Sequence, residues 1–269
     1  MGARIHPLAH VAATAELADN VVIGPFCVIG PEVRIGEGTE LLNNVTVVGH
    51  TTIGRGNRIY PGAVIGTEPQ DVSYDGSPTR VEIGDFNTIR ECVTISRATT
   101  KEDGVTRIGN HNYLMACCHV AHDCKLGNHI VLANSALLGG HVHVHDHAII
   151  SGNVGVHHFA TVGRFSFVGG QSRIVHDVPP YMLVDGNPSW VRCVNVVGLR
   201  RHGMTGEQIS ALAEAHRLIY RARMGLEHAE TLLRSNGKWT AEVEHLFEFL
   251  RAQFSGCHGR AREAIRRAA

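Results

Sequence analysis

Aliphatic residues recur at every sixth position along most of the chain. From Ile5 to Ile65 each sixth residue is Ile, Leu or Val, and the same spacing returns at Ile83 and, shifted by one residue, from Ile108 to Ile174. In all, 26 positions of this pattern carry an aliphatic side chain. A six-residue repeat predicts a parallel β-helix, in which three repeats form one triangular coil and the aliphatic residue points into the core.

The positions around each aliphatic residue fit the same geometry. The fourth residue after it is small in most repeats, as at Ala9, Cys27 and Ala136, which suits an inward position beside a corner. The residue directly after it is often glycine, as at Gly24, and glycine tolerates corner dihedral angles that a Cβ disfavours. Residues 18 apart should therefore stack in columns with a spacing of about 4.8 Å.

Two interruptions break the repeat. Residues 66–82 span one coil's length and have polar residues where aliphatic ones are expected. Residues 98–107 insert polar sequence and cause the shift by one residue. Loops that leave a rigid solenoid often carry function. We therefore expect the first loop to contact substrate. For the second loop, a functional role and a purely structural insertion both remain open.

The sequence after Ile174 predicts helices in place of strands. Val178-Pro179-Pro180 is expected to end the prism. The segment TGEQ, which begins at Thr205, has the pattern of a capping box and predicts a helix. Two further helices are predicted, one over about 226–235 and one that begins after Thr240.

We therefore predict two domains. The first is the β-helix over residues 1–190, and the second is a small α-helical domain over residues 191–269. Residues 259–269 are rich in arginine and are predicted to form a frayed basic helix end.

The amino-acid composition indicates how charge is distributed along the chain and in which cellular compartment the protein is expected. Basic and acidic residues balance at 25 each, but residues 191–269 hold 13 basic against 8 acidic ones. This excess indicates either an ordinary basic surface or a landing site for an acidic partner. No apolar run is long enough to span a membrane, and the repeat begins at Ile5, so neither insertion nor a signal peptide is expected. The seven cysteines form no C-x-x-C pair, which favours the reducing cytoplasm.

One group of the 19 histidines is placed for chemistry. In the segment HVAHDC, His122 falls on an outward position of its repeat and is followed by Asp123. The residues 18 and 36 positions further on are Gly140 and His158. A neutral imidazole can take a proton from an alcohol that attacks an acyl carbon, while a carboxylate orients the ring and a glycine N–H binds the oxyanion. The pattern therefore fits acyl transfer.

The segments AHDCKLGNHIVLANSALLGGHVHV, GVHHF, HDVPPYMLVDGNP and VVGLRRHG resemble the UDP-N-acetylglucosamine 3-O-acyltransferases of lipid A biosynthesis. The similarity extends to IGTEPQDVSYDGSPTRVEIGD and IRECVTISR and weakens after about residue 225. The resemblance implies a left-handed coil, which is an exception to the usual right-handed crossover. It also implies a cytoplasmic homotrimer. This trimer would transfer a 3-hydroxyacyl chain from acyl carrier protein to the glucosamine 3-hydroxyl of UDP-N-acetylglucosamine, the first step of lipid A biosynthesis.

The resemblance also implies roles for single residues. His122 would be the general base, Asp123 would orient it, and the Gly140 N–H would stabilise the tetrahedral intermediate. Asp71 would accept a hydrogen bond from the 3-hydroxyl of the acyl chain. The other candidates would bind substrate: His119, His141 and His157 in the sugar-nucleotide and acyl pocket, Asn195 and Arg201 at the uridine diphosphate, and Gly170 at the end of the acyl chain.

The chain departs from the family's pattern at a few positions. Ser73 stands where a lysine is usual, and His158 replaces a usual glutamine. These departures leave open the exact sugar and the requirement for an acyl 3-hydroxyl. Glycine at position 170 leaves room for long chains of about fourteen carbons, since a steric wall discriminates chain length better than buried methylenes do. The candidates for contact with the acidic carrier protein are Arg164, Arg173 and Arg200.

Other readings remain open on the residues alone. The alternating run from His141 to His147 invites comparison with the zinc sites of γ-type carbonic anhydrases, but no ligand set closes a tetrahedron. We therefore expect neither a metal nor a cofactor, and no nucleic acid. An acetyl-coenzyme-A-dependent transferase could use the same scaffold, as could a purely structural solenoid. A later N-acyltransferase of the pathway would normally carry an extra N-terminal domain.

Overall fold

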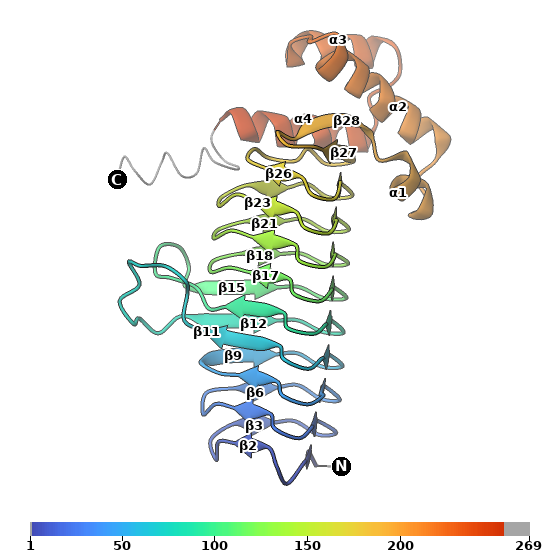
Figure 1. Cartoon of the computed structure of the whole chain (residues 1–269). Coiled ribbons are helices and arrows are strands. Elements are labelled where there is room, and N and C mark those ends of the chain that lie inside the picture. The colour runs from blue at the N-terminus through green and yellow to red at the C-terminus, as the bar shows by residue number, and fades with distance from the viewer. Residues whose placement is uncertain (1, 256–269) are drawn as a thin grey trace.

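The computed structural model describes residues 2–255, and most of this length is a left-handed parallel β-helix (Figure 1). The strands form three sheets, one for each face of a triangular prism. Among the described residues the strand pairings are parallel, except that β27 and β28 pair with each other in antiparallel fashion. The fold predicted from the six-residue repeat is confirmed. The basic helix end predicted over 259–269 lies outside the described residues.

The three sheets are named here in the order in which the chain enters them. The first sheet runs β1 (Arg4–Ile5), β4 (Val22–Ile23), β7 (Glu40–Leu41), β10 (Arg58–Ile59), β13 (Thr88–Ile89), β16 (Tyr113–Leu114), β19 (Val131–Leu132), β22 (Ile149–Ile150), β25 (Phe167–Val168), β27 (Met182–Asp185) and β28 (Trp190–Val194). The second runs β2 (His10–Val11), β5 (Val28–Ile29), β8 (Thr46–Val47), β11 (Val64–Thr67), β14 (Thr94–Ser96), β17 (His119–Val120), β20 (Leu137–Leu138), β23 (Gly155–Val156) and β26 (Arg173–Ile174). The third contains β3 (Glu16–Leu17), β6 (Arg34–Ile35), β9 (His50–Ile53), β12 (Arg80–Ile83), β15 (Val105–Ile108), β18 (Lys125–Leu126), β21 (His143–Val144) and β24 (Thr161–Val162).

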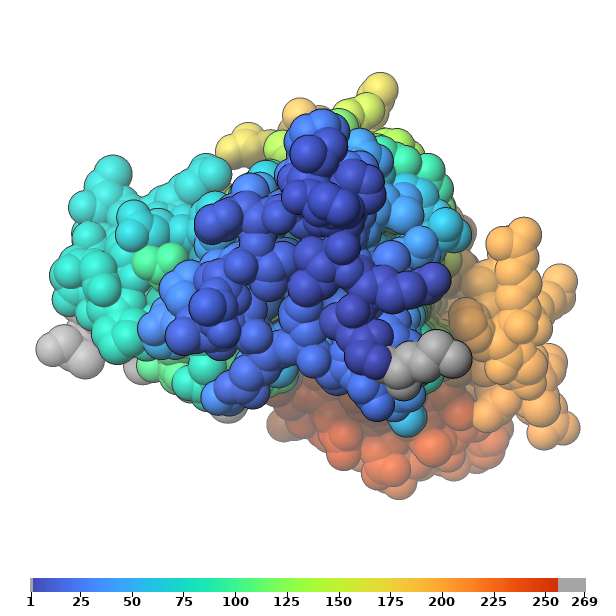
Figure 2. Space-filling model, turned by 90° about the horizontal axis from the view of Figure 1, so that it is seen from below, coloured from blue at the N-terminus to red at the C-terminus, as the bar shows by residue number. Residues whose placement is uncertain are grey.

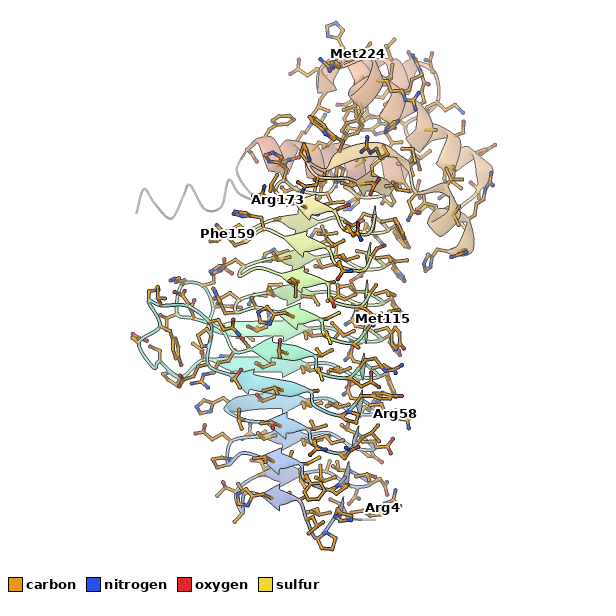
Figure 3. All side chains as sticks on the ribbon, in the orientation of Figure 1. Arg4, Arg58, Met115, Phe159, Arg173 and Met224 are labelled. Atoms are coloured by element: carbon orange, nitrogen blue, oxygen red, sulfur yellow. The ribbon has the colours of Figure 1, made fainter. Side chains whose placement is uncertain are left out.

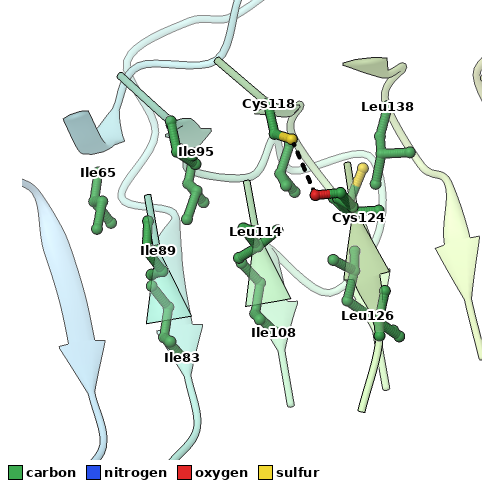
Figure 4. Packing of buried hydrophobic residues seen from close by; sticks show 14 of the residues in the cluster. Ile65, Ile83, Ile89, Ile95, Ile108, Leu114, Cys118, Cys124, Leu126 and Leu138 are labelled. Carbon is green, nitrogen blue, oxygen red and sulfur yellow. Dashed lines mark hydrogen bonds between the residues drawn. The ribbon is translucent and has the colours of Figure 1, made fainter. Parts of the chain in front are cut away.

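The core of the prism consists of the aliphatic residues of the repeat. From Ile23 to Ile174 every one of them is buried, whereas Ile5 is 47% exposed because its coil is the first and has no neighbour below. Cys118 and Cys124 fill small inward positions among these side chains (Figure 4). Their thiols donate to the carbonyl oxygens of the next coil, and burial raises the pKa of Cys124 to about 12. These thiols are therefore packing groups and not nucleophiles.

The prism continues further than the sequence suggested. Val162 bridges Val178, and β27 pairs in parallel with β25, so Val178 and Val184 both belong to the core. The prediction that Val178-Pro179-Pro180 ends the prism is wrong. The prolines only shorten the coil, because Val168 pairs with Val184 sixteen residues later and not eighteen.

Helices close the C-terminal end of the prism. They are α1 (Val196–Arg201), α2 (Gly206–His216), the π-helical turn η1 (Arg217–Arg221), α3 (Leu226–Ser235) and α4 (Ala241–Phe254). The capping box at Thr205 is present as predicted, with Gln208 as its second member. The domain boundary proposed at residue 190 falls at the start of β28, whose hairpin supplies Val184 to the prism core and Val194 to the helical core. Of the helices in residues 2–255, none has the length and apolar character needed to cross a bilayer.

Two loops project from one edge of the prism (Figure 2). The first loop, residues 68–79, joins β11 to β12, and the second loop, residues 97–104, joins β14 to β15. Both therefore lead from the second sheet to the third and leave from the same edge. Each is shorter than predicted because the flanking residues belong to strands. The loops contact each other, since the Thr79 hydroxyl donates to the Ala98 carbonyl over 2.5 Å.

Candidate active site

His122 and Asp123 lie at the edge of the prism from which the loops leave. They connect β17 to β18, and Asp123 adopts a left-handed backbone conformation with φ of 62°. This corner turns the two side chains toward each other, and His122 Nδ1 lies 2.8 Å from Asp123 Oδ2. The carboxylate is completely buried, while the imidazole is 13% exposed. Asp123 therefore holds a proton on Nδ1, which leaves Nε2 as the basic nitrogen.

Asp123 is held by further polar contacts. The Thr99 hydroxyl donates to Oδ2 over 2.7 Å, and the Thr99 N–H points at both carboxylate oxygens. The backbone N–H of Asp123 donates to the Thr106 hydroxyl. Burial raises the pKa of Asp123, but the hydrogen bonds from His122 and Thr99 and the charge of His141 outweigh it, so this pKa lies below its ordinary value. The carboxylate is ionised at neutral pH.

Gly140 lies directly under the ring of His122. A Cβ added to Gly140 would come 2.5 Å from His122 Cε1 and 2.7 Å from Nε2. Glycine is required here by the close approach of the imidazole to the backbone. None of the hydrogen bonds found within residues 2–255 is donated by the Gly140 N–H. That donor is available beside the basic nitrogen.

A hollow of about 460 Å³, here named the His122 hollow, runs along the second sheet next to this pair. Its lining includes His119, His122, Gly140 and His157, four residues that the sequence put at the site. His119 is bonded to the Thr94 hydroxyl, and burial and then the charge of His122 lower its pKa. The lining also includes Arg173, a candidate for contact with the carrier protein, together with Gln70 from the first loop and Leu137, to which the sequence analysis assigned no role.

His141 lies behind the pair and not in the hollow. It is 3% exposed, stacks on Phe159 at 4.4 Å between ring centroids, and meets the His122 ring edge-on. Its Nε2 is 3.6 Å from Asp123 Oδ2, and its Nδ1 is 3.1 Å from Glu102 Oε1. Figure 3 shows Phe159 on the same side of the prism as the loops. His141 is thus outward from the prism, as the repeat predicts, but covered by neighbouring side chains.

His122, Asp123 and His141 form the cluster of possible metal ligands found among the described residues. Their nearest ligand atoms lie within 4.8 Å of one another. A metal ion here would have to break the 2.8 Å bond between His122 and Asp123, whose oxygens already accept from Thr99. The donor set suits proton transfer better than metal binding. The run from His141 to His147 does not converge on one point, because residues six apart occupy different edges of the prism.

Asp71 lies in the first loop and is tied to the second. Lys101 forms a short hydrogen-bonded ion pair with its Oδ2, and Ser73 donates through N–H and hydroxyl to its Oδ1 over 2.9 and 2.8 Å. The Lys101 bond, followed by that from Ser73, holds the pKa of Asp71 well below its usual range. The resemblance led us to expect a lysine at the position of Ser73. In the structure Lys101 supplies the positive charge beside Asp71.

Asn195 and Arg201 lie elsewhere, at the two ends of α1 and beside the first sheet. They line a second hollow of about 690 Å³, here named the Arg201 hollow, with Arg217 and Arg221. Asn195 caps α1, because its Oδ1 accepts from the Gly198 N–H while its Nδ2 donates to the Phe165 carbonyl. One chain therefore does not bring Asn195 and Arg201 to His122.

Gly170 is exposed and lines neither hollow. The nearest atom to an added Cβ is the Gly152 carbonyl oxygen at 3.4 Å, so the position is open.

Comparisons with known proteins agree with this architecture. Residues 177–258 match the family model "Udp N-acetylglucosamine O-acyltransferase; Domain 2", and residues 32–67 match the bacterial transferase hexapeptide repeat. A crystal structure of a UDP-N-acetylglucosamine acyltransferase from Bacteroides fragilis superposes with a TM-score of 0.89 at 39% identity, covering 92% of this chain and 96% of that one. The Francisella novicida UDP-N-acetylglucosamine acyltransferase gives 0.86 at 42% identity, with 91% and 90% covered.

Sequence relatives are similar over nearly their whole length. The acyl-[acyl-carrier-protein]–UDP-N-acetylglucosamine O-acyltransferase of Syntrophobacter fumaroxidans is 48% identical over 92% of this chain and 96% of its own. The protein of the same name from Halorhodospira halophila is also 48% identical, again over 92% and 96%. The resemblance seen in the sequence is confirmed, and the chain belongs to the acyl-[acyl-carrier-protein]–UDP-N-acetylglucosamine O-acyltransferase family.

Proposed function

We propose that this protein transfers an acyl chain from acyl carrier protein to the 3-hydroxyl of UDP-N-acetylglucosamine, with His122 as the general base. The observation that carries this proposal is the hydrogen-bonded pair of His122 and buried Asp123 at the wall of a hollow, directly over Gly140. Family membership supports the acyltransferase reading over an acetyl-coenzyme-A-dependent enzyme or a zinc hydratase.

The reaction begins with proton transfer. The sugar 3-hydroxyl gives its proton to His122 Nε2 as its oxygen attacks the thioester carbonyl carbon. The carbonyl oxygen gains negative charge and accepts a hydrogen bond from the Gly140 N–H. The tetrahedral intermediate then collapses, the carbon–sulfur bond breaks, and the His122 imidazolium returns its proton to the leaving sulfur. The products are the O-acylated sugar nucleotide and the free thiol of the carrier.

Asp123 supports both halves of this cycle. Its negative charge stabilises the imidazolium that His122 becomes after the first proton transfer. Because the carboxylate is completely buried, water screens this attraction little. The depressed pKa of Asp123 keeps the group from taking up the proton itself.

The nucleotide end of the substrate requires a second subunit in this proposal. The three arginines of the Arg201 hollow, Arg201, Arg217 and Arg221, suit a diphosphate, and Asn195 lines the same hollow. The Arg201 hollow borders the first sheet, whereas the His122 hollow runs along the second. We therefore infer a homotrimer in which the Arg201 hollow of one subunit faces the His122 hollow of its neighbour.

We place the enzyme in the cytoplasm. The cysteines described by the structure are all free thiols, and three of them are exposed, which suits a reducing compartment. The excess positive charge of the C-terminal region suits contact with an acidic carrier protein. Arg173 at the His122 hollow is a candidate for that contact.

The direct test incubates the protein with UDP-N-acetylglucosamine and a panel of acyl carrier protein thioesters, with and without an acyl 3-hydroxyl. Mass spectrometry of the products should show an O-acylated sugar nucleotide that disappears with His122→Ala. Including the amino-substituted sugar analogue and chains of several lengths defines the acceptor and tests the space at Gly170. An N-acylated product from the first sugar, or no product from any thioester, contradicts the proposal.

The shared site has its own test. His122→Ala and Arg201→Ala subunits should each be inactive as homotrimers, whereas mixed trimers would contain an interface with both native residues. Co-expression should restore part of the activity, whereas mixing two His122 variants should not. Absence of restoration in mass-verified mixed trimers contradicts a site built between subunits.

A further inference from the structure

The second loop, residues 97–104, contacts three of the residues predicted for the site. Thr99 donates to the carboxylate of Asp123, and Lys101 pairs with Asp71. Glu102 lies beside His141, with 3.1 Å between Oε1 and Nδ1. The sequence analysis assigned no role to these loop residues. Three side chains within four positions of one loop thus each hold a different member of the site.

Thr99 acts on the same oxygen that orients the base. Asp123 Oδ2 accepts from the Thr99 hydroxyl over 2.7 Å and from His122 Nδ1 over 2.8 Å. The Thr99 N–H, 3.1 Å from Oδ2 and 3.2 Å from Oδ1, fixes the plane of the carboxylate. Thr99 is 3% exposed, so these bonds are shielded from water. The direction in which Asp123 faces His122 is therefore set from the loop.

The loop has anchors of its own outside the site. Arg97 donates to the Gly66 carbonyl and pairs with Glu68 at the start of the first loop. The Thr79 hydroxyl holds the Ala98 carbonyl, directly before Thr99. At the other end, Asp103 pairs with Lys125 and Arg107 on the third sheet. The loop is thus tied to rigid strands on both sides of Thr99 and Glu102.

We propose that loop 97–104 is a positioning device for the acyl transfer, in which Thr99 fixes Asp123 and Glu102 fixes His141 behind the base. This inference rests on the proposed function. Thr99 and Glu102 are positioning residues, because they act through Asp123 and His141. His141, held between Glu102 and Asp123 and stacked on Phe159, forms the wall against which the His122 ring rests edge-on.

The main test compares Thr99→Val with Thr99→Ser. Valine keeps the shape and removes the donor, and the loss of a hydrogen bond to a charged group predicts a fall in kcat of about 10- to 100-fold. With one donor fewer, more of the Asp123 charge acts on the His122 imidazolium. His122 then stays protonated to a higher pH, and the acidic limb of the kcat/KM profile moves upward. Serine should restore both kcat and the limb.

Thr79→Val is the matched control for Thr99→Val. It removes a buried hydroxyl that anchors the same loop but does not contact Asp123. We expect a lower melting temperature with an unmoved acidic limb. An equal shift of the limb in Thr79→Val, or an unchanged kcat and limb in Thr99→Val, overturns the inference. A wild-type protein without acyltransferase activity overturns the proposed function instead.

Glu102→Gln gives a second measurement, paired with Asp103→Asn in the same loop. Glu102 faces His141, while Asp103 faces Lys125 and Arg107 on the outside. We expect Glu102→Gln to lower kcat at least fivefold with KM within twofold, and Asp103→Asn to leave both within twofold. Similar effects of the two variants would show that the loop needs only its charge, which contradicts a specific hold on His141.

Discussion

The contact between Gly140 and His122 gives the sharpest prediction. Gly140→Ala places a methyl group 2.5 Å from His122 Cε1 and 2.7 Å from Nε2. Carbon atoms in contact prefer a separation of about 3.5–4.0 Å, so the ring must move by about 1 Å. The ring cannot move that far and keep its 2.8 Å bond to Asp123. Misplacement of a catalytic group by about 1 Å costs on the order of a hundredfold in rate.

The backbone at Gly140 itself accepts the change. Its φ lies outside the left-handed region, so alanine introduces no dihedral strain. We therefore expect the melting temperature of Gly140→Ala to stay within a few degrees of the wild type. In contrast, kcat for O-acylation should fall by about 100-fold. The matched control is Gly206→Ala on α2, where an added Cβ meets no atom within 4 Å.

The assay separates the two contributions to this loss. Steady-state kinetics over a range of pH reports kcat and the acidic limb that belongs to the base. A ring pushed away from Asp123 loses the stabilisation of its imidazolium, so the limb should move to lower pH. If Gly140→Ala keeps kcat within threefold and the limb in place, His122 does not work from the position seen over Gly140, and the assignment of the base fails.

Three further predictions concern charge and packing. Asp123→Asn should lower kcat by about 10³-fold with little change in KM, because an amide neither fixes the tautomer of His122 nor stabilises its imidazolium. The same kinetic assay measures this loss, and a loss under tenfold would contradict the role of Asp123. Lys101→Met should lower the melting temperature at pH 7. Because the folded pKa of Asp71 is depressed, the stabilisation is fully present above the unfolded value of about 3.9 and is lost as the pH falls through the folded pKa. The gap in melting temperature should therefore narrow below about pH 4, and a gap independent of pH would show that Lys101 acts by packing alone. Ile59→Ala should destabilise the prism by about 2–5 kcal/mol, because Ile59 is completely buried and stacks between neighbouring coils. Denaturant unfolding measures this loss, and Ile5→Ala, at an exposed position, should cost far less.

The aliphatic repeat was sufficient to predict the prism because each inward position meets the same environment as its neighbour one coil away. Ile23 pairs in register with Ile5 and with Leu41, each 18 residues away, and this relation follows from spacing alone. The contact between His122 and Asp123 was also predictable, because the two residues are adjacent in the chain and need no distant partner to meet. The capping box at Thr205 is also a local signal.

Contacts between loops far apart in the chain do not follow the six-residue repeat and could not be predicted from it. The burial of Asp123 under Thr99, 24 residues earlier, depends on the path of an irregular loop. The placement of His141 behind the base depends on Phe159 and Glu102 together. The extension of the core to Val184 required a shortened coil, which breaks the very spacing that was used to count coils.

The sequence by itself thus determined the left-handed prism through its repeat and family resemblance, together with the contact between His122 and Asp123 at a corner. The tertiary structure decided which side chains surround that pair, that a loop holds it from behind, and that the arginine-lined hollow lies on another face. The physical reason is that periodic burial is encoded every six residues along the chain, whereas a buried polar network forms only where loops of unrelated spacing meet.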